Sequence, residues 1–136
     1  MNTVNESIVE SIIPEDQRLE QLPKQFGQRF LLVENAVYQF MEQLCEQYNG
    51  GYWEFYSLSN GGFFMAPVMG NTVKIAWAEN YFEGTVTANA AGIIACLFAY
   101  SYAAMKGSEQ AAEMFHKLRD YIHHHEERDL IFKVVD

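Results

Sequence analysis

The segment from Gly84 to Met105 contains no charged side chain, and this feature limits the possible folds more than any other in the sequence. A membrane span is a poor interpretation, because the segment is rich in alanine, glycine, serine and threonine and neither flank carries a cluster of basic residues. Its apolar side chains leave no polar face when they are arranged on a helix. We therefore expect a helix buried at the centre of a water-soluble core.

Both ends of this central helix are marked by residues that favour helix termini. Thr87 is a suitable N-cap, and Gly107 offers the left-handed conformation with which helices often end. The predicted helix therefore covers residues 88–105. One side of it carries small residues, which permit close packing against a neighbour: Ala88, Ala91, Gly92, Ala95, Ala99 and Ala103.

Length and charge narrow the class of protein further. The chain has 136 residues and a mass of 15.7 kDa, so we expect one domain over residues 14–136, preceded by a flexible N-terminal arm over residues 1–13. A net charge of −9 argues against direct nucleic-acid binding, which needs clustered cations. Imitation of duplex DNA by a globule of this size would need about 20 negative charges. The chain carries fewer than half of them.

Helical periodicity and capping residues predict several further helices. A short helix is expected near Glu15 to Leu22, with Pro23 as its stop. An apolar stripe over residues 33–48 predicts a long amphipathic helix. Ser108 caps another amphipathic helix. Residues 130–135 form a closing apolar segment, strand or short helix, that packs on the core.

Between the predicted helices the hydrophobic pattern changes to the two-residue period of strands. Residues 52–58 and 63–67 are aromatic, β-prone runs joined by Ser59-Asn60-Gly61-Gly62, so they predict a hairpin. Alternation over residues 73–77 and 82–86 predicts two more half-buried strands. Short links favour one small antiparallel β-meander of three to four strands. The expected fold is therefore α+β, with about four to five α-helices, including one central apolar helix.

Catalytic signatures are absent from the sequence, which has no nucleophile elbow, phosphate-binding loop or metalloprotease motif. We therefore expect no enzyme activity, no catalytic residue, no cofactor and no metal. Cys45 and Cys96 lack metal-binding spacing and are expected to be buried free thiols. His116, Asp120 and His123 share one side of a predicted helix, so a metal-dependent enzyme is an alternative. Polar groups at a helix C-terminus explain these residues better.

The densest unusual feature is the set of aromatic residues in the predicted hairpin. Strand alternation places Trp53 and Phe55 on one face and Tyr52 and Tyr56 on the other. Helices that cover both faces of the sheet would bury all of them, and this arrangement is the expected one in a helix-rich chain. Otherwise some rings stay exposed, where tyrosine and tryptophan are good protein-contact residues.

Four segments resemble the ArdB/KlcA family of antirestriction proteins in their order and spacing. They read PEDQRLEQLPKQFG (Pro14 to Gly27), GGYWEFYSLSNGGFFMAP (Gly50 to Pro67), FEGTVTANAAGIIACLFA (Phe82 to Ala99) and IFKVVD (Ile131 to Asp136). The resemblance spans residues 14–136, and at Asn89 the chain departs from the acidic residue expected in the family. It implies a compact α+β fold peculiar to the family and a cytoplasmic protein carried by plasmids or other mobile elements.

The function that the resemblance implies is restriction evasion. Proteins of this family inhibit DNA cleavage by host type I restriction-modification enzymes, with modification largely spared and without DNA mimicry. The resemblance supplies no catalytic residue, so the contact residues are a hypothesis from this sequence alone.

The hypothesis is a monomer that docks on the restriction enzyme, directly or through a host factor, and that contacts neither nucleic acid nor membrane. Exposed aromatic side chains would anchor the contact, and an acidic rim would steer the protein toward a basic surface. The predicted contact residues are Tyr52, Trp53, Tyr56, Trp77, Glu126, Glu127, Asp129 and Asp136. An acidic DNA-mimic inhibitor is the alternative mode of binding.

Overall fold

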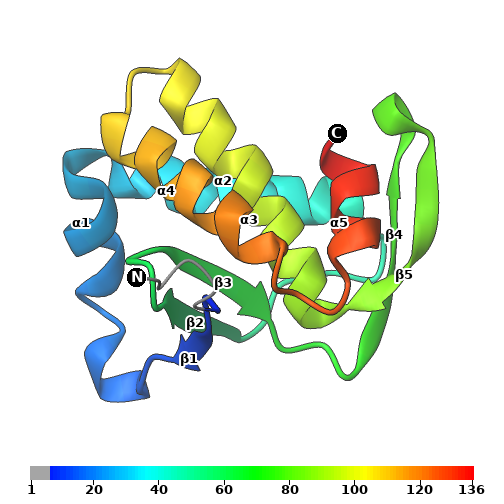
Figure 1. Cartoon of the computed structure of the whole chain (residues 1–136), viewed down its shortest axis with the longest axis horizontal. Helices are drawn as coiled ribbons and strands as arrows, with labels where there is room; N and C mark the ends of the chain where they lie inside the picture. The colour runs from blue at the N-terminus through cyan, green and yellow to red at the C-terminus, as the bar shows by residue number, and fades with distance from the viewer. Residues whose placement is uncertain (1–6) are drawn as a thin grey trace, which may run out of the picture.

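Helix α3 (Ala88–Met105) runs through the middle of the computed structural model, which describes residues 7–136 (Figure 1). The other helices and 3-10 turns are η2 (Glu15–Gln17), α1 (Gln21–Phe26), η3 (Gly27–Arg29), α2 (Phe30–Leu44), η4 (Ala78–Asn80), α4 (Glu109–Ile122) and α5 (Arg128–Val135). The strands are β1 (Glu10–Ile12), β2 (Trp53–Leu58), β3 (Phe63–Pro67), β4 (Thr72–Trp77) and β5 (Phe82–Thr87). The predicted α+β class is confirmed.

Helix α3 begins and ends where its capping residues predict. The Thr87 hydroxyl accepts a hydrogen bond from the Ala90 N–H at 3.1 Å, and Gly107 follows the helix with a φ of 103°. By length and composition alone α3 could cross a membrane, but 67% of it is buried inside the protein. It is the core helix that its lack of a polar face indicates.

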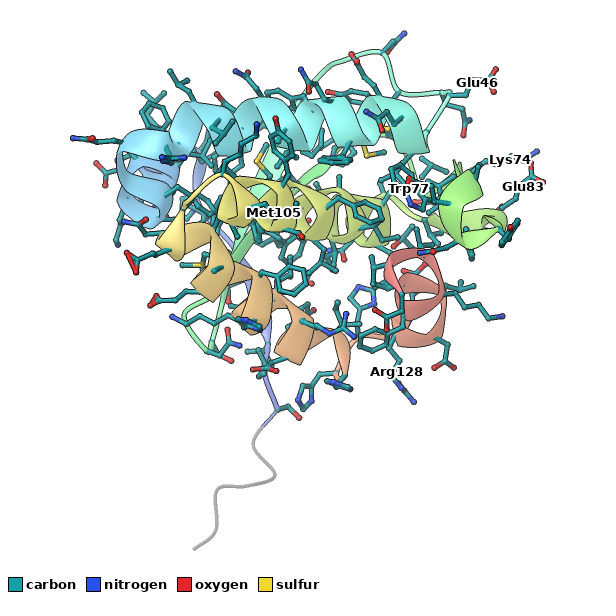
Figure 2. All side chains as sticks on the ribbon, turned by 90° about the horizontal axis from the view of Figure 1, so that it is seen from above. Glu46, Lys74, Trp77, Glu83, Met105 and Arg128 are labelled. Carbon is teal, nitrogen blue, oxygen red and sulfur yellow. The ribbon has the colours of Figure 1, made fainter. Side chains whose placement is uncertain are left out.

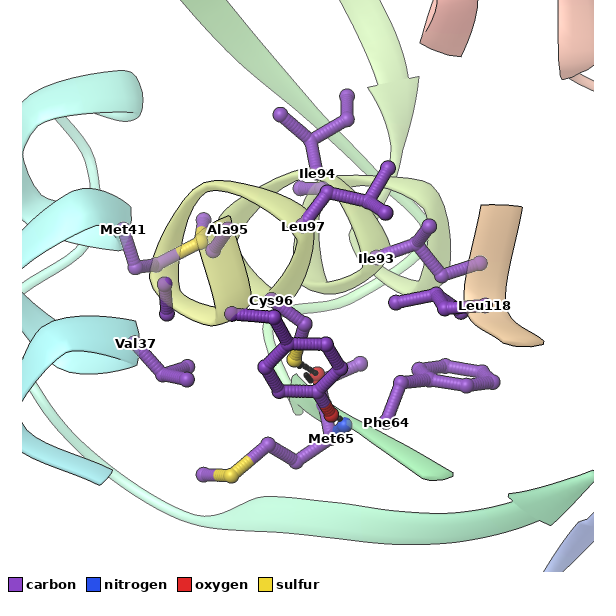
Figure 3. Close-up of a cluster of buried hydrophobic side chains, with 14 of the residues drawn as sticks. Val37, Met41, Phe64, Met65, Ile93, Ile94, Ala95, Cys96, Leu97 and Leu118 are labelled. Atoms are coloured by element: carbon purple, nitrogen blue, oxygen red, sulfur yellow. Dashed lines mark hydrogen bonds between the residues drawn. The ribbon is translucent and has the colours of Figure 1, made fainter. Parts of the chain in front are cut away.

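The largest contacts of α3 are with helix α2, helix α4 and strand β3, and α5, β4 and β5 also touch it. The contact with β3 is very close, because a Cβ atom added at Gly92 would lie 2.5 Å from the Ala66 Cα and 2.6 Å from the Met65 carbonyl oxygen. One turn further on, Cys96 lies against the same strand, with its Sγ 3.4 Å from the Met65 nitrogen (Figure 3). The small-residue side of α3 therefore allows the helix to approach the sheet at a distance that a larger side chain would prevent.

Both cysteines are free and buried, as predicted. Burial raises the pKa of the Cys96 thiol to about 12, so the thiolate is scarcely populated at neutral pH. Cys45 lies just after α2 rather than within it, as its C-cap residue. Neither thiol is in a position to act as a nucleophile on a solvent-borne substrate.

The strands form two separate antiparallel sheets. In the first, β2 lies between β1 and β3; in the second, β4 pairs with β5 alone. The prediction of a single meander of three to four strands is wrong at the step from β3 to β4. Strand β3 ends at Pro67, which has no N–H to donate, and Gly70 then turns the chain with a φ of 85°. The chain therefore leaves the first sheet and begins a second one.

The N-terminal segment is also more ordered than its sequence indicates. Residues 10–12 form strand β1 and pair with β2, so the prediction of a flexible arm over residues 1–13 is wrong for this stretch. Residues 1–6 of the predicted arm lie outside the described residues. A short, largely exposed strand has little hydrophobic periodicity, so only its pairing partner reveals it.

Two helix boundaries differ from prediction, and one open alternative is resolved. Pro23 is the third residue of α1 instead of its stop, because a proline in the first turn loses no helical hydrogen bond. Helix α2 ends at Leu44, before the predicted 48. Ser108 caps α4 as predicted, by accepting a hydrogen bond from the Ala111 N–H. The closing apolar segment is a helix, α5.

The close packing of α3 on β3 predicts that Gly92→Ala destabilises the protein strongly. The new methyl group would meet backbone atoms of β3, which cannot move aside as a flexible side chain could. We expect a loss of about 3 kcal/mol in the free energy of unfolding, measured by urea denaturation. Ser101→Ala, on a partly exposed side of α3, should change stability by less than about 0.5 kcal/mol. Equal stability of both variants would contradict the packing argument.

Candidate protein-docking surface

Two of the predicted contact residues are buried in the first sheet. Trp53 is 4% exposed and Tyr56 is 8% exposed, so the prediction that they are available to a partner is wrong. The Trp53 Nε1–H donates to the Tyr48 hydroxyl at 3.0 Å, and the Tyr56 ring stacks on Phe64 with centroids 4.5 Å apart. Rings of α1 and α2 pack on the face that carries Trp53, and Tyr121 of α4 packs on Phe64 on the other face. Helices therefore cover both faces of the hairpin, as the sequence favoured, while β1 pairs with the edge of β2.

Tyr52, by contrast, is 49% exposed. Its ring lies under the Arg18 guanidinium, 4.7 Å from its centroid, and its hydroxyl accepts a hydrogen bond from the same group. Arg18 also contacts the Phe55 ring at 4.4 Å and donates to the Trp53 carbonyl oxygen. These contacts hold the Tyr52 ring against Arg18. About half of the side chain is nevertheless exposed and can meet a partner.

Trp77 belongs to a group of four partly exposed aromatic rings that come from three elements. It stacks on Phe98 of α3 at 4.5 Å between centroids, and Phe98 in turn lies 5.5 Å from Phe40 of α2. Phe40 also contacts Tyr102 of α3 at 6.4 Å. We call these four residues, Phe40, Trp77, Phe98 and Tyr102, the aromatic strip. The sequence singled out Trp77 alone, because the other three lie on helical stripes that indicate core packing.

The aromatic strip continues toward the C-terminal end of α3. Tyr102 is 41% exposed and Met105 is 84% exposed, and Figure 2 looks down on this side, with Trp77 and Met105 at opposite ends of the helix. No member of the strip is charged, and the cation beside it is Lys106, whose Nζ lies 5.5 Å from the Tyr102 centroid. An apolar, aromatic centre depleted of charge is typical of the core of a protein–protein interface.

The four predicted rim acids are in different situations. Glu126 and Asp129 are exposed, as the hypothesis requires. Asp136 is exposed but forms an ion pair with Arg119 at 3.0 Å. Glu127 is occupied within the protein, because its carboxylate accepts hydrogen bonds from both the backbone N–H and the hydroxyl of Thr87. Glu127 therefore holds Thr87, the residue that caps α3, in place. The prediction that Glu127 is a free acid at the rim of the contact is wrong.

A polar cluster next to Glu127 joins the N-terminus of α3 to the end of α4. Asn89 donates to the Glu10 carboxylate at 3.1 Å, and Tyr121 donates to the same carboxylate. The buried His125 contacts the Asn89 side-chain oxygen through Nε2 at 2.9 Å, while its Nδ1 accepts from the Glu127 N–H. With Nδ1 as an acceptor, the tautomer that fits carries its proton on Nε2, which donates to Asn89. An acid at position 89 would place a second carboxylate beside Glu10.

Burial, and then the Glu10 carboxylate, raise the pKa of Tyr121 well above its usual value, so Tyr121 remains a hydrogen-bond donor over the physiological range. Burial raises the pKa of Tyr56 in the same direction. All members of this cluster are matched as donors and acceptors. The cluster therefore joins β1 and α3 to the C-terminal end of α4 through its hydrogen bonds.

The alternative of a metal site on α4 gains no geometric support. Within residues 7–136, no group of three or more histidine, cysteine, aspartate or glutamate side chains is placed to hold a metal ion. The His116 ring lies against Phe115, and the His123 ring lies against Phe132 on α5. His116, Asp120 and His123 are therefore not brought together.

One exposed aromatic residue has no signal in the sequence. Tyr81, at the tip of the β4–β5 hairpin, is 97% exposed and adopts a left-handed conformation with a φ of 56°. Among the described residues it is the one non-glycine residue with positive φ. The tip is held to α5 by a hydrogen bond from the Asn80 side chain to the Val134 carbonyl. Strand alternation cannot reveal such a residue, because its conformation is a property of the turn.

Comparison with known proteins places this geometry in a family. The family described as Antirestriction protein matches residues 46–136. The antirestriction protein KlcA of Escherichia coli is 39% identical over 142 residues, covering 100% of both chains. An uncharacterized protein, YafX of Escherichia coli strain K12, is 37% identical and covers 91% of this chain and 85% of its own length.

The solved structures agree with the sequence relatives. One solved chain superposes with a TM-score of 0.86 at 39% identity, covering 100% of both chains. It comes from work on KlcA and ArdB, which are reported to show a novel fold and antirestriction activity against type I DNA restriction systems in vivo but not in vitro. The present chain is therefore a small α+β protein of that fold. It belongs to the antirestriction protein family, as the resemblance in its sequence indicates.

The hydrogen bonds of Glu127 to Thr87 predict that removing its side chain destabilises the protein, whereas removing that of the neighbouring Glu126 does not. Glu127→Ala leaves the Thr87 N–H and hydroxyl without their acceptor, so we expect a loss of about 2 kcal/mol in the free energy of unfolding. Glu126→Ala is the matched control, since its side chain is exposed, and should change stability by less than about 0.5 kcal/mol. Urea denaturation of the two variants checks this prediction, which fails if they lose stability equally.

The left-handed conformation of Tyr81 predicts that a substitution there can stabilise the protein. Asparagine tolerates positive φ better than tyrosine, so Tyr81→Asn should raise the free energy of unfolding by about 0.5 kcal/mol. Leu19→Asn replaces an equally exposed side chain, 97% exposed, outside the positive-φ region and should bring no such gain. Thermal denaturation of both variants provides the measurement, and a destabilised Tyr81→Asn would contradict it.

Proposed function

We propose that this protein protects incoming plasmid or mobile-element DNA from host type I restriction-modification enzymes by docking on a protein, and that it acts in the cytoplasm as a monomer. Membership of the antirestriction family and the reported activity of KlcA and ArdB support this function. The single structural observation that carries the docking mode is the aromatic strip, which leaves uncharged rings partly exposed on an anionic protein.

The charge of the protein favours docking over imitation of DNA. A net charge of −9 is less than half of the charge that a DNA segment of the same length carries, about 20. Part of that charge is also engaged within the fold, since Glu127 binds Thr87 and Asp136 pairs with Arg119. A DNA mimic needs many free carboxylates in a regular array. This protein has fewer free carboxylates than such a mimic would need.

In the proposed contact, Trp77 and its neighbours in the aromatic strip are the apolar anchors. The exposed carboxylates of Glu126 and Asp129, with Asp136 at the end of the chain, act at longer range by steering the protein toward a basic surface. Trp53 and Tyr56 are buried in the first sheet and have no direct part in the contact. Tyr52 contacts the partner through its exposed surface. A restriction enzyme that must change conformation to cleave can be blocked by a protein that binds one of its states.

The experiment that tests this function is the plating of unmodified phage on a host with a type I system, with and without the protein. We expect expression of the wild-type protein to raise the plating efficiency. The double variant Tyr102→Ser, Met105→Ser removes exposed apolar surface without cutting into the core, and it should weaken protection because loss of interface anchors lowers affinity by about tenfold or more.

Leu19→Ser is the matched control, because Leu19 is 97% exposed and lies outside the aromatic strip. It should leave protection unchanged. Full protection by the double variant, with both variants folded, would reject the strip as the contact surface. Absence of protection by the wild-type protein would reject the function itself. Salt-sensitive displacement of DNA from purified restriction enzyme would instead favour mimicry, and stoichiometric zinc in the purified protein would favour the metal-dependent alternative.

A further inference from the structure

The second sheet has an unpaired edge. It contains β4 and β5 alone, in an antiparallel register that runs from Thr72–Thr87 to Trp77–Phe82. Within residues 7–136 no strand pairs with the outer edge of β4. An unpaired strand edge presents a row of backbone donors and acceptors, and natural proteins usually cover or block such rows.

One side-chain contact shows which backbone groups face outward. The Lys74 N–H donates to the Gln47 side-chain oxygen at 3.0 Å, so it points away from β5. Because successive N–H groups of a strand alternate in direction, those of Thr72 and Ala76 point the same way. The glutamine side chain thus already occupies the position that the carbonyl of an added strand would take.

This edge lies along a groove of about 740 Å³ between the C-terminal end of α2 and the β4–β5 hairpin. Gln43 and Leu44 contribute from α2, and Ile75 and Ala76 contribute from β4. Figure 2 shows Glu46 just beyond the end of α2, on the same side of the molecule as Lys74 and Glu83 of the hairpin. Residues 83–85 of β5 also line the groove, opposite residues 74–76 of β4. The groove is therefore bounded by the end of α2 on one side and by the β4–β5 hairpin, including the open edge of β4, on the other.

The charges around the groove are unequal. Glu42, Glu46 and Glu83 line it, against the single cation Lys74. A segment that carries lysine or arginine side chains therefore complements the groove, whereas an acidic segment would be repelled. A second copy of this chain is a poor occupant, since each copy carries a net charge of −9 and would bring the same carboxylates to the contact.

We propose that this groove binds an extended, basic segment of a partner protein, which adds to the edge of β4 as a third strand. The outward N–H and C=O groups of β4 supply the affinity, with the Gln47 side chain displaced from the Lys74 N–H, and the carboxylates on the walls select the basic side chains. The groove shares no lining residue with the aromatic strip, although Trp77 of the strip follows Ala76 on β4, and the proposal rests on its own observations. A direct binding measurement without any restriction enzyme therefore tests it independently of the antirestriction function.

The probe is a fluorescent nine-residue peptide of alternating lysine and valine, titrated with the full-length protein and followed by anisotropy. The key variant is Ala76→Pro, which removes one outward N–H. An edge strand accepts a proline where its N–H faces away from the sheet. We expect at least a tenfold rise in the Kd, with the thermal midpoint preserved. Ala76→Ser keeps the N–H and should bind as the wild type does.

Two further comparisons separate strand addition from attraction of charge. The same peptide with N-methylated valines keeps its charge but loses backbone donors, so it should bind at least tenfold more weakly. The double variant Glu42→Gln, Glu46→Gln should weaken binding and reduce its sensitivity to salt. Should Ala76→Pro prove unable to fold, the N-methylated peptide decides the question with the wild-type protein.

Several results would overturn the proposal. These are no binding of the lysine–valine peptide at millimolar concentration, equal binding of the N-methylated peptide, and unchanged binding by a folded Ala76→Pro variant. Equal affinity for a glutamate–valine peptide would overturn the basic specificity. A dimer that light scattering detects in the wild type and not in Ala76→Pro would show that a second copy occupies the edge instead.

Discussion

The packing of α3 against β3 is the contact on which the rest of the structure depends. Gly92 lies directly over Ala66, at a distance that leaves no room for a side chain. This approach places Cys96 against the Met65 backbone, and it lets the Tyr100 hydroxyl donate to the Phe63 carbonyl at 2.6 Å. Helices α2 and α4 then flank α3. A helix without charge is stable in water only because its neighbours surround it in this way.

The two surfaces with a proposed role, the aromatic strip and the open edge of β4, lie outside the packed core around α3. Toward its C-terminal end α3 emerges from the core, and there Tyr102 and Met105 become exposed, with Tyr102 beside the Phe40 ring of α2. The β4–β5 hairpin leaves the first sheet after Pro67, and it therefore keeps an open edge that a single meander would have covered. The first surface follows because the core covers α3 from Ala88 onward but not its C-terminal end, and the second follows because the chain leaves the first sheet.

The candidate contact residues show how far local patterns reach. Alternation correctly places Trp53 and Tyr52 on opposite faces, but it does not by itself tell that Tyr56 is buried against Phe64. Acidic residues near a C-terminus look free in a sequence. Glu127 is nevertheless bound to Thr87, forty positions earlier in the chain. Trp77 was identified without its companions, because Phe40 and Phe98 belong to helical stripes that indicate burial.

The sequence by itself determined the central helix with both of its caps, the α+β class, the anionic character and the antirestriction family. These properties depend on composition, on periods of two or four residues, or on motifs that are contiguous in the chain. Only the tertiary structure decided that the strands divide into two sheets, that β1 joins the first of them, and that rings from three elements form the aromatic strip. The physical reason is that each of these depends on contacts between distant segments. The free energy of such contacts comes from burial and pairing in the completed core, which no local pattern records.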